Sequence, residues 1–304
     1  EQEIHFKNGK PEGLLTGWYE SGRKEYETPY KNGKKDGLST KFSPYSGYGE
    51  IETHYKNGKK EGLETEWHLS GKKSKWYETL WKNGKEDGLA TGWYKSGKKH
   101  GEMHYKNGSQ DVVKEWYESG IQKQEFFRYK NGNEGLHTGW YESGQKEYEW
   151  PFKNGVPEGL RTDWYESGKK KSEGLWKNGE REGPKKVWYE SGRKKNVYHY
   201  KNGKEEGLRK GWYESGQKEF EIHFKNGEQD GLETFWFESG TKNIERHYKN
   251  DELEGLETYW YKSGKKKYLK HYKNGKENGL RKEWDENGTL TYEGNFVDGV
   301  EEIR

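Results

Sequence analysis

The pair Asn-Gly recurs along this chain at an almost constant interval of 23 to 26 residues, and Asn250-Asp251 fills the one gap in the series. A second motif, Trp-Tyr-Glu-Ser-Gly, keeps the same phase and begins at Trp18, Trp116, Trp140, Trp164, Trp188 and Trp212. A fixed period in this range indicates a tandem array, in which each unit is one supersecondary element that packs on its neighbours. Such an array offers a long surface rather than one unique pocket.

The composition favours strands over helices. Apolar residues supply 27% of the chain and aromatic residues 16%, and Ala90 is the single alanine. Trp, Tyr, Phe and Thr favour strands, and alanine is the strongest helix former. Basic and acidic residues nearly balance, at 56 against 53, so we expect no basic face for nucleic acid. The absence of cysteine excludes disulfides and thiolate metal sites, and no apolar run approaches the ~20 residues of a membrane span.

Each unit contains two turn signals separated by short segments of alternating apolar and polar residues, which predicts one β-hairpin per unit. We therefore predict an all-β fold, an elongated, twisted antiparallel sheet of about twelve tandem 24-residue hairpins. The predicted array is a single domain over residues 1–304. It has a partial first repeat at 1–13, irregular repeats around 41–56 and 72–83, and a terminal repeat at 279–304. Because the chain begins within a unit, we expect further sequence before residue 1.

The length of the Asn-Gly turn decides which residues share a face of the sheet. A two-residue Asn-Gly loop pairs Lys31 with Lys34 and places Tyr30 opposite the face of Leu14 and Trp18. A three-residue Lys-Asn-Gly loop pairs Tyr30 with Lys34 instead. The three-residue loop is preferred, because it gives one continuous aromatic face. Read in the same way, Glu20-Ser21-Gly22 pairs Trp18 with Lys24 and Thr16 with Tyr26.

The core is predicted to consist of the repeated tryptophans with the repeated leucines beside them. This core comprises Trp18, Trp140, Trp164, Trp188, Trp212 and Trp260 with Leu14, Leu136, Leu160, Leu208 and Leu256. One hairpin buries too little apolar surface to offset the entropy of ordering about 24 residues, so the hairpins must stack.

The repeated motifs resemble a known family. Units with Ser-Gly or Asn-Gly after the aromatic pair, followed by Tyr-Lys-Asn-Gly-Lys-x-Glu-Gly, are similar to the variant MORN repeats of bacterial proteins, including the YwqK-family antitoxins. The residues from Asp285 to Phe296 are the closest single match, and the resemblance covers essentially the whole chain. The array differs from the usual pattern in its many tryptophans and in Glu-Ser-Gly where Glu-Asn-Gly is common. The resemblance implies an antitoxin or immunity role.

The sequence predicts no catalysis, no cofactor and no metal site. Seven histidines occupy one slot of the repeat, at His5, His54, His104, His199, His223, His247 and His271, which we place on the face opposite the tryptophans. Equivalent slots lie ~9.6 Å apart, too far for two imidazoles to share one metal. Every Glu or Ser that could serve in catalysis is a consensus residue present many times.

The predicted binding surface is a row of tyrosines that directly follow the tryptophans, with nearby histidines. This surface comprises Tyr117, Tyr141, Tyr165, Tyr189, Tyr213, His199 and His223. A structural explanation is also open, in which these rings pack on Lys stems of neighbouring strands. Tyrosine is enriched where proteins bind proteins or sugars. If the row binds a partner, replacing Tyr141, Tyr165 and Tyr189 by Ser weakens association and costs at most ~1 kcal/mol of stability per site.

Two classes of function remain open from the sequence. The first is a non-enzymatic scaffold that binds a protein, either a toxin or a second copy of itself. The second is an extracellular or cell-envelope element, either a fibre subunit or a glycan-binding array. The first class predicts the bacterial cytoplasm if the partner is a toxin, and the second predicts secretion or the cell surface.

Overall fold

The computed structural model describes residues 1–45, 49–68, 75–129 and 132–302. These residues form strands, turns and bends without any helix, and so none forms a helix able to cross a membrane. Their strands belong to one antiparallel sheet of sequential hairpins, which confirms the predicted all-β repeat fold. The chain divides into two compact units, residues 1–146 with 152–156 and residues 147–151 with 157–304. That the repeats form one domain over residues 1–304 stays a prediction. Parts of both predicted irregular repeats, 46–48 and 72–74, lie outside the described residues.

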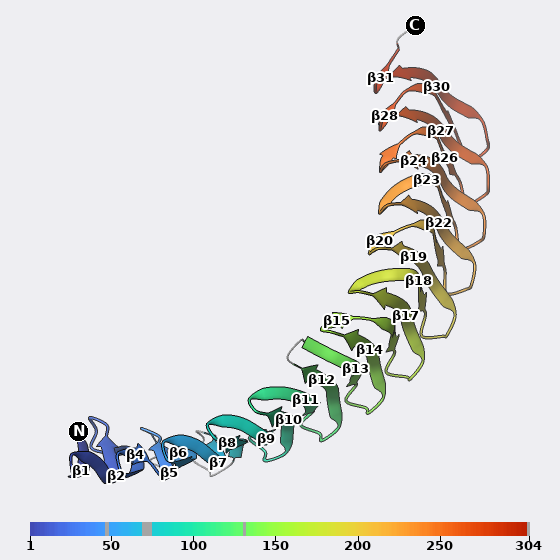
Figure 1. Ribbon diagram of the computed structural model, residues 1–304. Coiled ribbons are helices and arrows are strands. Elements are labelled where there is room, and N and C mark those ends of the chain that lie inside the picture. The colour runs from blue at the N-terminus through green and yellow to red at the C-terminus, as the bar shows by residue number, and fades with distance from the viewer. Residues whose placement is uncertain (46–48, 69–74, 130–131, 303–304) are drawn as a thin grey trace. The chain divides into compact units, whose positions relative to one another are not determined.

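The strands follow one another in chain order (Figure 1). The first unit contains β1 (Gln2–Lys7), β2 (Lys10–Trp18), β3 (Lys24–Lys31), β4 (Lys34–Lys35), β5 (Gly37–Phe42), β6 (Gly49–Lys56), β7 (Lys59–Trp67), β8 (Lys75–Lys82), β9 (Lys85–Trp93), β10 (Lys99–Lys106), β11 (Ser109–Trp116), β12 (Gln122–Tyr129) and β13 (Gly132–Trp140). The strands β14 (Lys146–Lys153) and β15 (Val156–Pro157) contain residues of both units.

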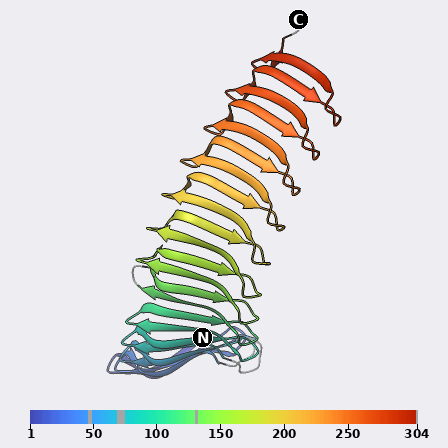
Figure 2. The same ribbon diagram turned by 90° about the vertical axis from the view of Figure 1, so that its right-hand side faces the viewer.

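The second unit continues the same pattern. It contains β16 (Gly159–Trp164), β17 (Lys170–Lys177), β18 (Glu180–Trp188), β19 (Lys194–Lys201), β20 (Lys204–Glu205), β21 (Gly207–Trp212), β22 (Lys218–Lys225), β23 (Glu228–Trp236), β24 (Lys242–Lys249), β25 (Glu252–Leu253), β26 (Gly255–Trp260), β27 (Lys266–Lys273), β28 (Lys276–Glu277), β29 (Gly279–Trp284), β30 (Leu290–Val297) and β31 (Val300–Glu301). Figure 2 shows its hairpins side by side, with the loops that follow the tryptophans at one edge.

The Asn-Gly turns are two-residue loops, so the predicted three-residue loop is wrong. Lys31 pairs with Lys34, and Tyr30 pairs with Lys35. Both turn residues have positive φ, 51° at Asn32 and 81° at Gly33, as a type I′ turn requires. This turn matches the right-handed twist of the two strands it joins. The prediction failed because it required a single aromatic face, whereas the sheet carries aromatic residues on both faces.

The Glu-Ser-Gly loop follows the prediction in one respect and departs from it in another. Trp18 pairs with Lys24 across the loop, as predicted. Tyr26 lies opposite Gly17 instead of Thr16, because the register shifts between Gly17 and Trp18. This bulge places one extra residue in the second strand and moves the aromatic side chain to the other face.

The two faces of the sheet therefore differ. The leucine face carries the residues equivalent to Leu14, Thr16 and Trp18 on one strand and to Glu27 and Pro29 on the next. The aromatic face carries the residues equivalent to Leu15 and Gly17 and to Tyr26, Thr28 and Tyr30. Directly paired residues of an antiparallel sheet share a face, so this assignment follows from the register.

The predicted core is only partly correct. The repeated tryptophans are half-buried, but Leu14, Leu136, Leu160 and Leu256 are exposed by 38 to 52%. Leu208 is half-buried. The most buried apolar side chains among the described residues are instead Ala90, Val113, Ile222 and Phe296, all on the aromatic face. A one-layer sheet has no second layer to cover its leucines. Among the described residues, the buried side chains on the leucine face are short ones such as Thr16, between larger neighbours.

Candidate binding surfaces

Tyrosines of the predicted row tie their hairpins to the next one within each unit. The Tyr189 hydroxyl donates a hydrogen bond of 2.9 Å to the carbonyl oxygen of Trp212, in the following repeat. Equivalent bonds of 2.8 to 3.0 Å run from Tyr94, Tyr117, Tyr165, Tyr213 and Tyr261 to the carbonyls of Trp116, Trp140, Trp188, Trp236 and Trp284. Burial, and next the charge of nearby glutamates, raises the pKa of Tyr165, Tyr189 and Tyr213. These hydroxyls are therefore used within the protein, and a contact of the row with a partner stays a prediction.

An acidic residue, in most repeats the one before the glycine of a Glu-Gly or Asp-Gly step, supplies a second tie. The carboxylate of Glu182 accepts a hydrogen bond of 3.0 Å from the backbone N–H of Asn202, at the next Asn-Gly turn. The neighbouring N–H of Gly203 donates to the carbonyl of Arg181 at 3.0 Å. The same carboxylate bond recurs at the turns of Asn32, Asn57, Asn83, Asn107, Asn154, Asn178, Asn226 and Asn274. These consensus residues thus stack the turns.

The histidines lie on the leucine face and not on the opposite face as predicted. His223 pairs directly with Leu208, and the register shifts at His223, between Ile222 and Phe224. Its Nδ1 lies 2.8 Å from the carbonyl oxygen of Leu232. A carbonyl only accepts, so Nδ1 carries the proton and Nε2 is the acceptor of the neutral ring. His199 makes the same contact with Leu208 at 3.1 Å, and both rings are exposed.

Nine exposed leucines lie in a row on the leucine face, which we call the leucine row, whereas Leu208, Leu232 and Leu280 on the same face are half-buried. In the first unit the row comprises Leu14, Leu38, Leu63, Leu80, Leu89 and Leu136, and in the second unit Leu160, Leu175 and Leu256, with exposures of 37 to 52%. Leu160 pairs directly with Leu175, and Leu63 with Leu80. Single exposed leucines are ordinary, but neighbouring exposed leucines such as these two pairs mark a candidate contact surface.

Charged residues border this row within the same face. Lys170 donates to Glu173 at 2.8 Å and lies 5.6 Å from the ring centre of Trp188. Lys186, on the adjacent strand, approaches the other oxygen of Glu173 at 3.2 Å. The hydrogen bond from Lys170 in particular lowers the pKa of Glu173. An apolar stripe beside paired charges has the composition of a protein interface with a polar rim.

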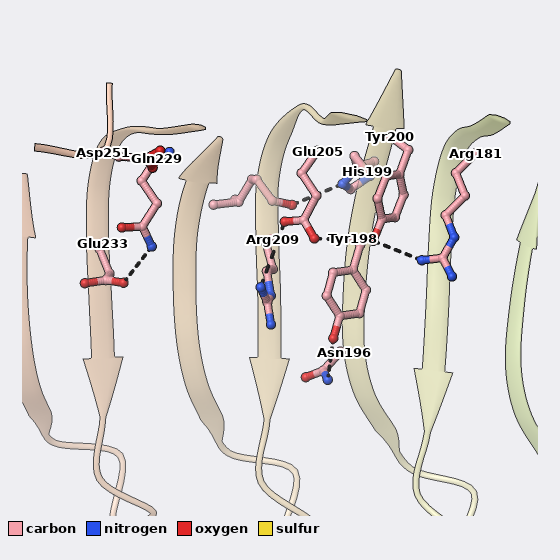
Figure 3. Close-up of polar contacts among 11 residues, drawn as sticks. Arg181, Asn196, Tyr198, His199, Tyr200, Glu205, Arg209, Gln229, Glu233 and Asp251 are labelled. Carbon is pink, nitrogen blue, oxygen red and sulfur yellow. Dashed lines mark hydrogen bonds and ion pairs between the residues drawn. The ribbon is translucent and has the colours of Figure 1, made fainter. Parts of the chain in front are cut away.

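The aromatic face of the second unit carries arginines stacked on rings. Arg161 lies 4.3 Å from the ring centre of Trp150, and Arg209 lies 4.7 Å from that of Tyr198. Arg181 lies 5.3 Å from both Trp176 and Tyr200. Figure 3 shows this network, in which Arg181 donates to the hydroxyl of Tyr200 and that hydroxyl donates to Glu205. Guanidinium stacking fixes the planes of these side chains.

A nearly buried ion cluster lies further along the same face. Arg246 donates to Glu233 through Nε, and its Nη1 lies 3.7 Å from Glu257. The two glutamates are only 3% and 5% exposed. Burial by itself lowers the pKa of Arg246. The hydrogen bond to Glu233 and the charge of Glu233 together outweigh this effect, so the pKa lies above its ordinary value. The arginine is thus permanently charged between two carboxylates that water barely reaches.

The structure separates the predicted site residues into two groups. Tyr117, Tyr165, Tyr189 and Tyr213 lie in the row of ties, whereas His199 and His223 lie beside leucines on the leucine face. Tyr141 is half-buried in the first unit.

Sequence reasoning missed the arginines of the aromatic face. The sequence did contain a signal for them, because the consensus repeat uses lysine and these arginines stand at strand positions outside the consensus. They are Arg161, Arg181, Arg209, Arg246 and Arg281. The described part of the chain holds no group of three or more His, Asp or Glu side chains able to bind a metal ion. The absence of catalysis and of a cofactor stays a prediction.

Two crystal structures, of TcdB2-TccC3-Cdc42 and of TcdB2-TccC3, are similar to this chain at 8% and 10% identity, with TM-scores of 0.19 and 0.15. The matches cover 94% and 93% of this chain but only 18% and 21% of those chains. At these scores the likeness says nothing about function. No curated protein matches the chain.

The model of the MORN repeat variant matches eight segments, in register with the hairpins. They are residues 11–32, 86–107, 133–154, 157–178, 205–226, 229–250, 253–274 and 277–298. These segments cover more than half of the sequence, and each ends at the first residue of an Asn-Gly turn or at the equivalent Asn250 or Asp298. The chain is therefore a MORN repeat protein and belongs to the MORN repeat variant family.

Proposed function

We propose that this MORN repeat protein is a non-enzymatic scaffold that binds another protein along its leucine row. The observation that supports this proposal is the exposure of leucine at the same repeat position in both units, reaching 52% at Leu160. The side chain of the neighbouring Thr162 is only 8% exposed, so the fold covers a short side chain on this face but leaves the leucine uncovered. Exposing leucine costs free energy in water, and a partner with an apolar ridge recovers it.

The partner that fits this row is a protein with apolar side chains at the spacing of alternate strands, ~9.6 Å. The Lys–Glu pairs beside the row would form the polar rim of such an interface. Within this proposal, the antitoxin or immunity role implied by the repeat family makes the partner a protein toxin. A fibre subunit would instead place a second copy of the chain on the row, and a glycan-binding array would place a sugar there.

Site-specific photocrosslinking in the native host tests the proposal. A benzophenone residue is placed at Leu160 or Leu256, and as controls at Tyr165 in the tyrosine row and at Tyr200 on the aromatic face. We expect one protein to crosslink at the two leucine positions and not at the controls. Crosslinks only to another copy of the chain support the fibre instead. Crosslinks only at Tyr165 contradict the leucine row and support the tyrosine row.

The crosslinked protein is then purified and its affinity for variants measured. The change Leu160→Glu with Leu175→Glu should weaken binding at least about tenfold, since it puts two charges into the apolar centre of the interface. Both side chains are exposed, so the fold should tolerate the change. Val300→Glu is the matched control, because Val300 is an exposed apolar residue outside the row. Equal binding by the leucine variant and the control would refute the proposed surface.

A further inference from the structure

The aromatic face of the second unit contains a hollow between β16, β17 and β18. Its volume is ≈ 180 Å³, and its lining includes Gly174, Trp176, Arg181, Lys185 and Tyr200. A cavity of about 150 Å³ is large enough to hold benzene, so this hollow accommodates a small ligand or one group of a larger one.

The hollow exists because one repeat position lacks a side chain. Gly174 occupies the place that Trp150, Tyr198 and Ile222 hold in neighbouring hairpins. The nearest atoms to a Cβ at Gly174 would be those of Lys185, its Cγ at 3.4 Å and its Cα at 3.8 Å. The missing side chain leaves space in a face that is otherwise filled by rings and long side chains.

Two cations at this hollow form no ion pair with a carboxylate among the described residues, and the carboxylates of Asp163 and Glu182 also line it. Arg161 binds Oδ1 of Asp163 at 2.8 and 3.0 Å, and Ser172 donates to the other oxygen of Asp163 at 2.5 Å. By contrast, Arg181 and Lys185 take part in none of the ion pairs found among the described residues. Burial, and next the charge of Arg181, lowers the pKa of Lys185. This pair of cations therefore lies in a setting that an anion would stabilise.

The donors are also held in place. The Arg181 guanidinium lies 5.3 Å from the ring centres of Trp176 and Tyr200. One of its nitrogens donates to the Tyr200 hydroxyl at 3.2 Å (Figure 3). A guanidinium has five N–H donors, so this single hydrogen bond leaves most of them for a ligand. Fixed donors lose little entropy when they bind, which favours recognition of an anion.

We propose that this hollow is a binding site for one anionic group, a carboxylate or a phosphate, with Arg181 and Lys185 as its donors and Trp176 as its apolar wall. The two donor side chains lie on the face opposite the leucine row, and the lining of the hollow also includes Leu175 of that row. An acidic sugar, a small organic acid and a phosphate ester share the required chemistry.

Calorimetric titration of the full chain tests the site with three probes, sodium phosphate, sodium acetate and sodium glucuronate, each against sodium chloride at equal ionic strength. We expect saturable binding of at least one probe at one site, with Kd below about 10 mM. Arg181→Gln and Lys185→Gln should each weaken it at least about tenfold, because each removes a charged donor. The probe with the highest affinity indicates the chemical class of the natural ligand, since glucuronate adds a ring that Trp176 can contact.

Two further variants separate the site from general charge. Arg209→Gln removes a cation at the repeat position equivalent to Lys185, and it should leave binding unchanged. Gly174→Thr restores a side chain found in other hairpins, as at Thr28, and it should abolish binding while the circular dichroism of the sheet is retained. If none of the three probes shows saturable binding, or if Arg209→Gln reduces binding as strongly as Arg181→Gln, the site does not exist.

Discussion

Replacing Arg246 by Met is expected to destabilise the second unit by about 3–5 kcal/mol. The substitution leaves Glu233 and Glu257, which are 3% and 5% exposed, without the cation between them. Removing one partner from a buried ion cluster costs far more than the cluster contributes as a whole, because the remaining charges stay desolvated. Urea unfolding followed by tryptophan fluorescence measures the change.

A combined variant distinguishes the cost of leaving two buried carboxylates without a cation from the cost of losing the packing of the arginine side chain. Arg246→Met together with Glu233→Gln and Glu257→Gln removes all three charges, and most of the stability should return. Lys242→Met, on the same strand, breaks an ion pair in which the lysine is 46% exposed, and it should cost no more than about 1 kcal/mol. If Arg246→Met costs as little as Lys242→Met, the two glutamates are solvated and this description of the aromatic face is wrong.

Replacing Tyr165, Tyr189 and Tyr213 together by Phe is expected to cost about 3 kcal/mol, or about 1 kcal/mol for each lost hydrogen bond. Each change leaves a part-buried tryptophan carbonyl in the next repeat without its donor. The same three positions changed to Ser should cost about twice as much, because the half-buried rings are lost as well. The sequence-based expectation was that serine at tyrosines of this row costs at most ~1 kcal/mol per site.

Tyr45→Phe serves as the control for the hydroxyl, since Tyr45 is 86% exposed, and it should not change stability. Thermal unfolding of the phenylalanine and serine triple variants separates the hydroxyl from the ring. A phenylalanine variant as stable as the parent would mean that the hydrogen bonds to the carbonyls of Trp188, Trp212 and Trp236 contribute nothing.

The repeat fold could be predicted because its turn and strand signals are local. Asn-Gly at a constant interval and alternating apolar residues specify hairpins without knowledge of distant contacts. The pairing of Tyr26 could not be predicted in this way. It depends on a bulge between Gly17 and Trp18, which shifts the register by one residue and thereby exchanges the faces of the side chains that follow. The preference for one aromatic face then led to the wrong Asn-Gly loop.

The candidate sites were harder to predict, for a related reason. In a repeat array the consensus residues are those that hold the repeats together, as Tyr189 and Glu182 do through bonds to the next hairpin. The sequence shows that such residues recur but not whether their polar atoms are already bonded. The hollow at Gly174 arises where a repeat departs from its neighbours, and only the register places Arg181 and Lys185 beside it.

The central claim, that the tyrosine row is used inside the protein, is tested most directly by NMR titration of the protein with 13C-labelled tyrosine. Tyr165→Phe, Tyr189→Phe and Tyr213→Phe assign the three signals. Burial raises the pKa of each of these phenols in the fold above the ordinary value of 10.0. As the pH rises past 10, the unfolded chain releases phenol protons that the folded protein still holds. The stability that these three tyrosines contribute is therefore complete below pH 10 and is lost as the pH rises through their raised pKa values. We predict that the three signals titrate with midpoints above that of tyrosine in the unfolded chain, together with loss of the sheet. Reversible ionisation of all three near pH 10, with the sheet intact, would contradict the account.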